Sequence, residues 1–158
     1  MYRIGFSEDI HQIKKGRKLF LGGVFLENVD GLDGHSDADV VLHAVGESIL
    51  GALALGDLGK HFPDTDSQYK DISSSVLVKH IVSLMKEKGF EINNIDIQVG
   101  CSTVKLANHI EEMRNNIASL LETNVENVSV KAMSFNCVGP IGEGKAIKAS
   151  SIVLLKRD

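Results

Sequence analysis

The sequence contains little cysteine, proline or tryptophan: its 158 residues include two cysteines, two prolines and no tryptophan. Cys101 and Cys137 form neither a CxxC pair nor the dense pattern of a disulfide-stabilised secreted domain, so we expect a reducing, cytoplasmic setting. The chain begins with MYRIGFSEDIHQ, which lacks the basic and apolar stretch of a secretory signal and the composition of a transit peptide. We therefore expect a cytoplasmic protein without a leader.

The chain also lacks an excess of basic residues, since its formal net charge is -4 at pH 7. Binding to nucleic acid depends on neutralising many phosphates with Lys and Arg, so this charge argues against a nucleic-acid partner. A small phosphorylated ligand stays compatible, because a metal ion, a lysine and helix N-termini can offset a mildly acidic surface. The longest apolar-rich run, residues 40–58, is interrupted by His43, Glu47 and Asp57, which indicates a core helix and no membrane span.

Hydrophobic residues make up 43% and charged residues 24% of the chain, the usual composition of a globular protein. At this length we expect one domain over residues 1–158. The apolar periodicity predicts strands at 2–6 and 19–25, helices from 36 or 37 to 53 and over 72–85, a strand at 95–99, a helix over 110–121, and strands at 128–132 and 147–155. Helices in separate blocks over a mixed sheet are typical of an α+β fold.

A candidate metal site combines Asp9 and His11, at the end of the first predicted strand, with His43 on the first predicted helix. Alternation along a strand places residues 9 and 11 on one face, so both side chains aim at one point. His43 stands among apolar residues and needs a partner for its imidazole, which a shared metal ion would supply. Three ligands leave a fourth tetrahedral position open, as in catalytic sites. Zinc is our first choice, and the N/O ligand set also suits manganese, iron or cobalt.

Ordinary hydrogen bonding is the alternative interpretation of these residues, because a D-x-H pair is common without a metal. His35 and Ser36 precede the first helix, and together with its terminal amides they could converge on an anion near the metal. We expect Ser36 or Asp37 to cap this helix, and capping does not exclude the additional role as a ligand contact. The remaining histidines have no comparable neighbours and are expected to face solvent or to bond to backbone groups: His61, His80 and His109.

Several longer motifs follow one another along the chain: Asp9-Ile10-His11, Leu21-Gly22-Gly23-Val24, His35-Ser36-Asp37-x-Asp39-Val40-x-Leu42-His43-Ala44, Ala54-Leu55-Gly56-Asp57-Leu58-Gly59-Lys60 and Phe62-Pro63-Asp64-Thr65-Asp66. With these motifs the chain resembles, over essentially its whole length, the 2-C-methyl-D-erythritol 2,4-cyclodiphosphate synthase family. The resemblance implies a ferredoxin-like α+β fold with helices on one face of a mixed sheet, and a homotrimer with active sites between subunits. It also implies an enzyme of the non-mevalonate isoprenoid pathway, a phosphorus–oxygen lyase that converts 4-diphosphocytidyl-2-C-methyl-D-erythritol 2-phosphate into the cyclic diphosphate and CMP.

The same resemblance implies roles for individual residues. It gives Zn²⁺ to Asp9, His11 and His43, a second ion, Mg²⁺ or Mn²⁺, to the substrate phosphates, and catalytic stabilisation of the transition state to His35 and Ser134. The implied substrate contacts are Asp9, Ile10 and His11; His35 and Ser36; Asp57, Leu58 and Gly59; a flap of Phe62, Pro63, Asp64, Thr65 and Asp66; a cytosine-binding loop of Cys101, Ser102, Thr103, Val104, Lys105, Leu106 and Ala107; and Met133, Ser134, Phe135 and Asn136.

Two positions depart from the family pattern. Asn136 stands where the family has a glutamate that helps to hold the second ion, and a neutral amide is a weaker ligand for a hard cation. Glu143 stands where an arginine often holds an isoprenoid diphosphate in a cavity on the trimer axis, so we expect weak or absent binding there unless Lys145 turns in. Two alternatives therefore stay open: a zinc-binding relative with impaired turnover, and an unrelated metallohydrolase.

Overall fold

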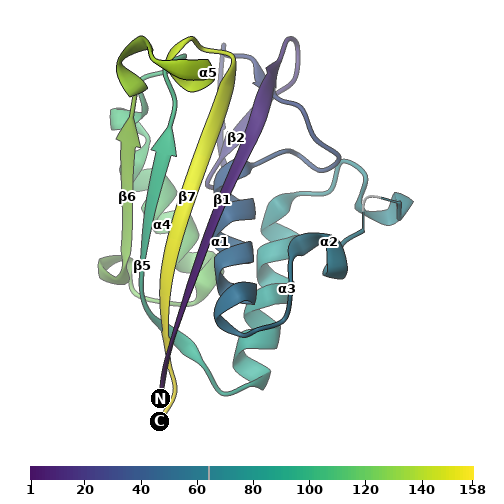
Figure 1. The fold of residues 1–158 in the computed structure, drawn as a ribbon, viewed down its shortest axis with the longest axis vertical. Coiled ribbons are helices and arrows are strands. Elements are labelled where there is room, and N and C mark those ends of the chain that lie inside the picture. Colours follow the sequence, from purple (N-terminus) through teal and green to yellow (C-terminus); the bar gives the residue numbers. More distant parts are fainter. Residues whose placement is uncertain (64) are drawn as a thin grey trace.

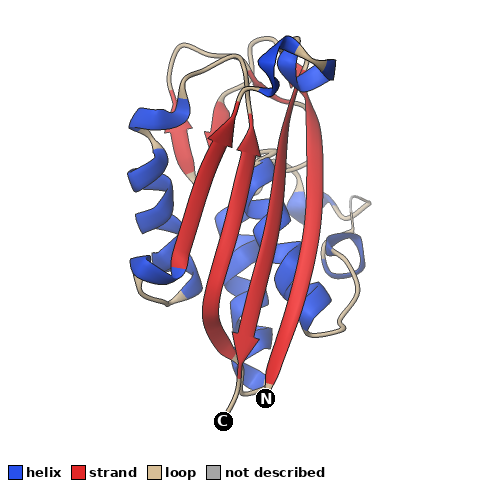
Figure 2. Ribbon diagram, turned by 60° about the vertical axis from the view of Figure 1, so that its left-hand side comes forward, coloured by secondary structure: helices blue, strands red, loops and turns tan. Residues whose placement is uncertain are grey.

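A mixed β-sheet forms one layer of the structure and helices cover one of its faces (Figures 1 and 2). The structure, a computed structural model, describes residues 1–63 and 65–158. The strand order in the sheet is β4-β1-β7-β5-β6. These strands are β1 (Tyr2–Lys14), β4 (Gly31–Leu32), β5 (Glu91–Gly100), β6 (Val128–Met133) and β7 (Ala146–Lys156). The predicted α+β class, with helices on one face of a mixed sheet, is confirmed.

The helical layer consists mainly of α1 (Val40–Ala52), α3 (Ser74–Glu87) and α4 (Ile110–Leu121). The short helical segments are α2 (Leu58–His61), α5 (Gly139–Gly142), η1 (Ser67–Tyr69), η2 (Leu106–Asn108), η3 (Val125–Asn127) and η4 (Phe135–Cys137). Within residues 1–63 and 65–158, no helix combines the length and the apolar character needed to cross a bilayer.

Strand β1 is much longer than the predicted 2–6, and its length positions the candidate metal ligands. It pairs antiparallel with β7 from Tyr2–Lys156 to Gln12–Ala146. Charged residues within the strand hid its continuation from the hydrophobic pattern, although burial alternates along it. Gly5 and Ser7 face the helices, and a Cβ on Gly5 would lie 1.9 Å from the Ser48 carbonyl oxygen. The absence of a side chain at position 5 therefore lets α1 pack directly on β1.

The predicted strand at 19–25 is wrong, because this segment is a hairpin of β2 (Leu19–Leu21) and β3 (Val24–Leu26). Gly22 and Gly23 form its turn with φ of 61° and 76°, a left-handed conformation that two-residue hairpin turns require and that glycine adopts without strain. The uninterrupted apolar character of the segment concealed the turn.

The first helix begins at Val40, and its N-cap is Asp39; the prediction that Ser36 or Asp37 would cap it is wrong. The fully buried Asp39 carboxylate accepts hydrogen bonds from the Val41 and Leu42 amides and from the two glycine amides of the hairpin turn. It thus satisfies helix-terminal donors and ties the hairpin to α1 at the same time. Because the His43 amide donates to the Asp39 carbonyl, the imidazole lies one helical turn from this anchor.

The two faces of the sheet differ in what covers them. Between the sheet and the helices lies the core, which includes the fully buried Leu50, Ile81, Ile97 and Met113. The opposite face carries exposed apolar side chains, which alternate along β1 with the buried residues and continue onto β7: Ile4, Phe6, Ile10 and Ile152. In Figure 2 the long helices lie behind the sheet, and of the described residues only a short helical segment lies over the top end of this face, where Ile141 of α5 is close to Ile10. Large apolar side chains exposed together on one face are typical of a protein–protein interface.

Candidate metal centre and its cavity

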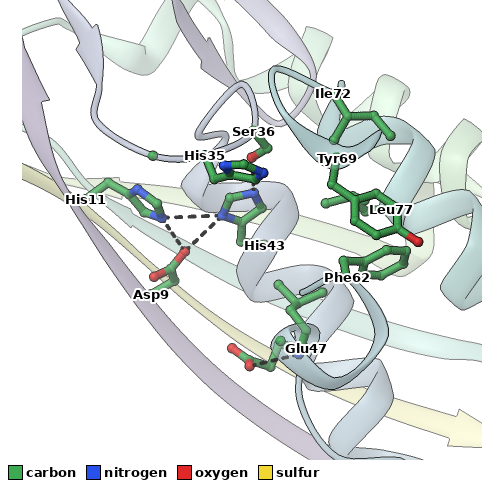
Figure 3. Close-up of a pocket in the computed structure, with 13 residues that line it drawn as sticks. Asp9, His11, His35, Ser36, His43, Glu47, Phe62, Tyr69, Ile72 and Leu77 are labelled. Carbon is green, nitrogen blue, oxygen red and sulfur yellow. Dashed lines mark hydrogen bonds and ion pairs between the residues drawn. The ribbon is translucent and has the colours of Figure 1, made fainter. Parts of the chain in front are cut away.

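Three side chains from two elements converge beside the sheet, as the sequence predicted. Asp9 and His11 project from one face of β1 and His43 from α1 (Figure 3). Asp9 Oδ2 lies 2.9 Å from His11 Nε2 and 3.2 Å from His43 Nδ1, and the two ring nitrogens are 3.4 Å apart. The side chains of Asp9, His11 and His43 are only 26%, 18% and 12% exposed, so this triangle of ligand atoms is largely shielded from bulk water.

This geometry fits a divalent metal ion. Zinc bonds to nitrogen and oxygen are ~2.0–2.2 Å long, which places neighbouring atoms of a tetrahedral site about 3.3 Å apart, close to the observed separations. Among the described residues, these three form the only group of His, Cys, Asp and Glu side chains close enough to share an ion. A carboxylate and two imidazoles bind several divalent ions, so the ligand set indicates a metal without selecting one.

The electrostatics of the cluster favour a positive charge at its centre. Burial by itself raises the pKa of Asp9, but interactions with the imidazoles of His11 and His43 outweigh burial and hold that pKa well below its usual range. Burial lowers the pKa of His11, but interactions with the Asp9 carboxylate and with Asp33 together outweigh burial and raise that pKa. His11 Nδ1 lies 2.5 Å from the Asp33 carbonyl oxygen, which only accepts, so Nδ1 donates and Nε2 faces Asp9. A proton or a metal ion between Nε2 and Oδ2 satisfies both groups.

The cluster opens into a cavity of about 330 Å³, within the range of small-molecule sites. One wall is polar and the other apolar (Figure 3). The polar wall carries Asp9, His11, His35, Ser36, His43 and Glu47, and the apolar wall carries Leu58, Phe62, Tyr69, Ile72 and Leu77. The cavity therefore places an ion site at one end of a space that can hold a small organic ligand.

His35 and Ser36 share this cavity with the cluster, so the structure brings them where the sequence suggested an anion site. His35 Nε2 is buried without a hydrogen-bond partner among the described residues. A buried polar atom without a partner is costly, and a ligand oxygen would satisfy Nε2 in the tautomer in which it carries the ring hydrogen. The guanidinium of Arg17 donates to the carbonyl oxygens of Gly34 and Ser36 and so holds this segment in place.

The other predicted contacts divide between the cavity wall and its surroundings. Leu58, Gly59 and Phe62 line the cavity. Asp57 instead caps α2 by accepting from the Lys60 amide, and Asp66 accepts from the Gln68 amide at the start of η1. Pro63 and Thr65 are described residues outside the wall, and Asp64 lies outside the described residues. Of the other histidines, His61 donates from Nε2 to the Leu55 carbonyl oxygen, and His80 packs on the Phe62 ring.

Two predicted segments lie together but away from this cavity. The loop of residues 101–107 follows β5, the segment 133–136 begins at the last residue of the neighbouring β6, and the Cys101 amide donates to the Met133 carbonyl. Within the described residues, neither segment contributes to the wall around Asp9, His11 and His43. One chain thus brings together the metal ligands with His35 and Ser36, and separately the proposed cytosine loop with Ser134.

Sequence reasoning missed several residues that shape the site. Glu47 lines the cavity, accepts from the Ser7 hydroxyl at 3.1 Å, and lies four residues after His43, a spacing that places both on one helix face. That spacing could have identified it. Tyr69, from the polar segment after α2, and Ser74, at the start of α3, contact the site only through tertiary packing and have no local signal in the sequence.

The fold and site together define an α+β protein with a candidate metal site beside a cavity for a small ligand. A model described as the YgbB family matches residues 2–156, and the chain belongs to this family. It is 50% identical over 155 residues to the 2-C-methyl-D-erythritol 2,4-cyclodiphosphate synthase of Brachyspira hyodysenteriae, covering 98% of each chain. It is 47% identical over 157 residues to the synthase of the same name from a Geobacillus species, covering 99% of each.

Solved structures agree with this relationship. The bifunctional IspDF of Campylobacter jejuni matches with a TM-score of 0.95 and 37% identity over all of this chain, which spans only 43% of that protein. The CDP complex of Plasmodium falciparum IspF matches with a TM-score of 0.87 and 34% identity, covering 99% of this chain and 97% of that one. The relatives are thus cyclodiphosphate synthases, and one was solved with a cytidine nucleotide bound.

Proposed function

We propose that this protein is a metal-dependent 2-C-methyl-D-erythritol 2,4-cyclodiphosphate synthase. Its substrate is 4-diphosphocytidyl-2-C-methyl-D-erythritol 2-phosphate, and its products are the cyclic diphosphate and CMP, which makes it a lyase of the isoprenoid pathway. Relatives of this name align along nearly the whole chain. The observation that carries the proposal is the Asp9–His11–His43 cluster at the polar end of a ligand-sized cavity.

The chemistry requires positioning and charge neutralisation. An oxygen of the 2-phosphate forms a bond to the β-phosphorus, the bond from that phosphorus to the bridging oxygen breaks, and CMP leaves with that oxygen. The reacting groups carry several negative charges, so the barrier lies largely in bringing them together in line. A bound divalent ion, for which we propose Zn²⁺, supplies positive charge to the diphosphate oxygens. Asp9, His11 and His43 hold it beside the cavity.

Residues around the ion contribute the remaining contacts. The unpartnered Nε2 of His35 can donate to a phosphate oxygen, and donation that strengthens as charge develops lowers the barrier. Ser36 lies beside it on the same wall. We propose that the second ion, Mg²⁺ or Mn²⁺, depends mainly on substrate phosphates and water, because Asn136 offers only a neutral amide.

We further propose that the working form is a homotrimer with each active site between two subunits. Two observations support this: the loop 101–107 and Ser134 lie away from the metal cavity of their own chain, and the open sheet face carries Ile4, Phe6, Ile10 and Ile152. A neighbouring copy that covers this apolar face can bring its own cytosine loop to the cavity. Sedimentation equilibrium tests the proposal, and a monomer at micromolar concentration contradicts it.

The same interpretation gives one domain over residues 1–158, a cytoplasmic location, and neither nucleic acid nor a membrane as partner. The net charge of -4 supports the exclusion of a nucleic-acid partner. Cell fractionation followed by immunoblotting of the native protein tests the location, and we expect the signal in the cytosolic fraction.

Turnover in ¹⁸O-labelled water separates the candidate functions. Purified protein, substrate, Zn²⁺ and Mg²⁺ are combined, and we expect stoichiometric CMP and a cyclic product without ¹⁸O, because the nucleophile is a substrate oxygen. An unrelated metallohydrolase would give an open-chain product that contains ¹⁸O. A zinc-binding relative with impaired turnover would bind CDP and zinc but release no CMP.

A further inference from the structure

His43 is held on both edges of its ring. Its Nδ1 faces Asp9 at the metal cluster, and its Nε2 lies 2.9 Å from Ser74 Oγ and 3.0 Å from Ser36 Oγ. Ser74 is fully buried and is the first residue of α3, a helix that packs against α1. The ring is therefore fixed between the cluster and the start of a second helix.

The direction of the hydrogen bond to Ser74 follows from a third residue, Asp37. Its carboxylate accepts from the Ser74 hydroxyl at 2.5 Å and from the Ser74 amide at 3.0 Å. A carboxylate accepts only, and a serine hydroxyl has a single hydrogen, so Ser74 uses that hydrogen toward Asp37. Toward His43 the Ser74 oxygen is then an acceptor, and His43 Nε2 must be the donor.

A neutral imidazole carries one hydrogen, so an Nε2–H donor leaves Nδ1 with a free lone pair aimed at the cluster. We infer that Ser74 and Asp37 are positioning residues of the metal centre, which fix the orientation and tautomer of His43 so that Nδ1 can bind the ion. The inference rests on the proposed role of His43 as a metal ligand. The Asp33 carbonyl does the same for His11 through its Nδ1. Such outer partners typically change metal affinity by about 10–100-fold when removed.

The same assignment frees the hydroxyl hydrogen of Ser36. Since Nε2–H donates to both serine oxygens, Ser36 accepts from His43 and from the Ala38 amide at 3.2 Å. Its own hydrogen is then available to a ligand oxygen in the cavity that Ser36 lines (Figure 3). One hydrogen-bond chain thus prepares a metal ligand and an anion donor on two neighbouring side chains, His43 and Ser36.

The test compares Ser74→Ala with Ser73→Ala in the full-length protein. Ser73 caps α3 through the Ser75 amide and does not contact His43, so it is a matched serine-to-alanine control at the same helix end. Zinc affinity is measured by chelator competition without substrate. We expect a loss of about 10–100-fold for Ser74→Ala and less than about twofold for Ser73→Ala. Wild-type affinity in a folded Ser74→Ala variant overturns the inference.

A spectroscopic measurement decides the question without any variant. In metal-free wild-type protein with ¹⁵N-labelled histidine, long-range ¹H–¹⁵N correlation identifies the protonated ring nitrogen, and we expect His43 as Nε2–H at a pH where it is neutral. An Nδ1–H tautomer overturns the inference, even if Ser74→Ala fails to fold. Failure of the proposed function is a separate result, because it appears as absent CMP release by a wild type that still binds zinc and has the expected tautomer.

Discussion

The metal cluster and the C-terminal loop, residues 133–137, are built in opposite ways. Asp9 and His11 lie on a paired strand, His43 lies on a helix packed against it, and every ligand atom has a partner within 3.4 Å. Ser134 is exposed, and its hydroxyl accepts from the Asn136 amide at a long 3.4 Å. One region is preorganised by the fold of a single chain, as catalytic metal sites require, and the other is weakly held.

The two regions also differ in backbone conformation, because three consecutive residues of the C-terminal loop have positive φ. Phe135, Asn136 and Cys137 have φ of 61°, 48° and 62°, and a left-handed conformation costs roughly 1–2 kcal/mol for an ordinary L-residue. Strain of this kind persists where surrounding contacts require it, and it is concentrated at functional sites. The difference between the regions therefore supports a loop that is completed by a neighbouring subunit and substrate.

We expect the largest effect from Asp9→Asn, which removes the carboxylate from the metal cluster. The amide removes the charge that binds the ion, and the charge neutralisation lost is worth several kcal/mol, so we expect CMP release to fall by about 10³-fold or more. Asp33→Asn is the control, because the Asp33 side chain pairs with Lys14 while its backbone carbonyl still bonds to His11. Zinc content and turnover are measured together, and a zinc-loaded, active Asp9→Asn protein would contradict the assignment.

The next largest effect is expected from Gly5→Ala, which tests whether the close packing of α1 on β1 stabilises the part of the fold that carries the cluster. In Gly5→Ala the new methyl meets the Ser48 carbonyl oxygen at 1.9 Å and the Ala52 amide at 2.7 Å, both backbone atoms. We expect a loss of about 3 kcal/mol in the free energy of unfolding, since the strand must move off the helix. Urea denaturation measures it.

Gly51→Ala is the matched control for Gly5→Ala. Gly51 lies in α1, and a Cβ there has its nearest contact at 4.0 Å. Because alanine is a better helix former, we expect a gain of about 1 kcal/mol in unfolding free energy. Similar losses for both variants would show that the close approach at Gly5 does not determine the stability of this region.

The sequence could predict features that depend on neighbouring residues in the chain, and it could not predict features that depend on contacts between distant segments. The Asp9–His11 pair and His43 followed from strand alternation and from the needs of a buried imidazole, and the structure brings them together. The cap at Asp39 could not be predicted, because its carboxylate is stabilised by amides of the distant Gly22–Gly23 turn. Ser74 and Glu47 likewise acquire their contacts only when α1 packs on β1 and α3.

The strain in the C-terminal loop predicts a smaller effect of opposite sign. Cys137→Gly removes a side chain from a left-handed position that glycine adopts freely, so we expect the unfolding free energy of the isolated chain to rise by about 1 kcal/mol. Cys137→Ala retains Cβ and should show no such gain. Urea denaturation of both proteins measures the difference, and equal stabilities would mean that the loop is not strained at this residue.

The smallest expected effect is the absence of a binding signal at Glu143, which follows α5 just beyond the C-terminal loop. Glu143 forms an ion pair of 2.5 Å with Lys145, so the acid is present and the nearby cation is engaged. Glu143 would repel an isoprenoid diphosphate at the position where the family resemblance implies an arginine. We therefore expect no measurable heat in calorimetric titration with geranyl diphosphate. Glu143→Arg reverses the charge and frees Lys145, so binding should appear. If the wild type binds geranyl diphosphate tightly and CDP abolishes this binding, the ligand lies in the metal cavity. If the wild type binds it tightly and CDP has no effect, Glu143 does not exclude the anion.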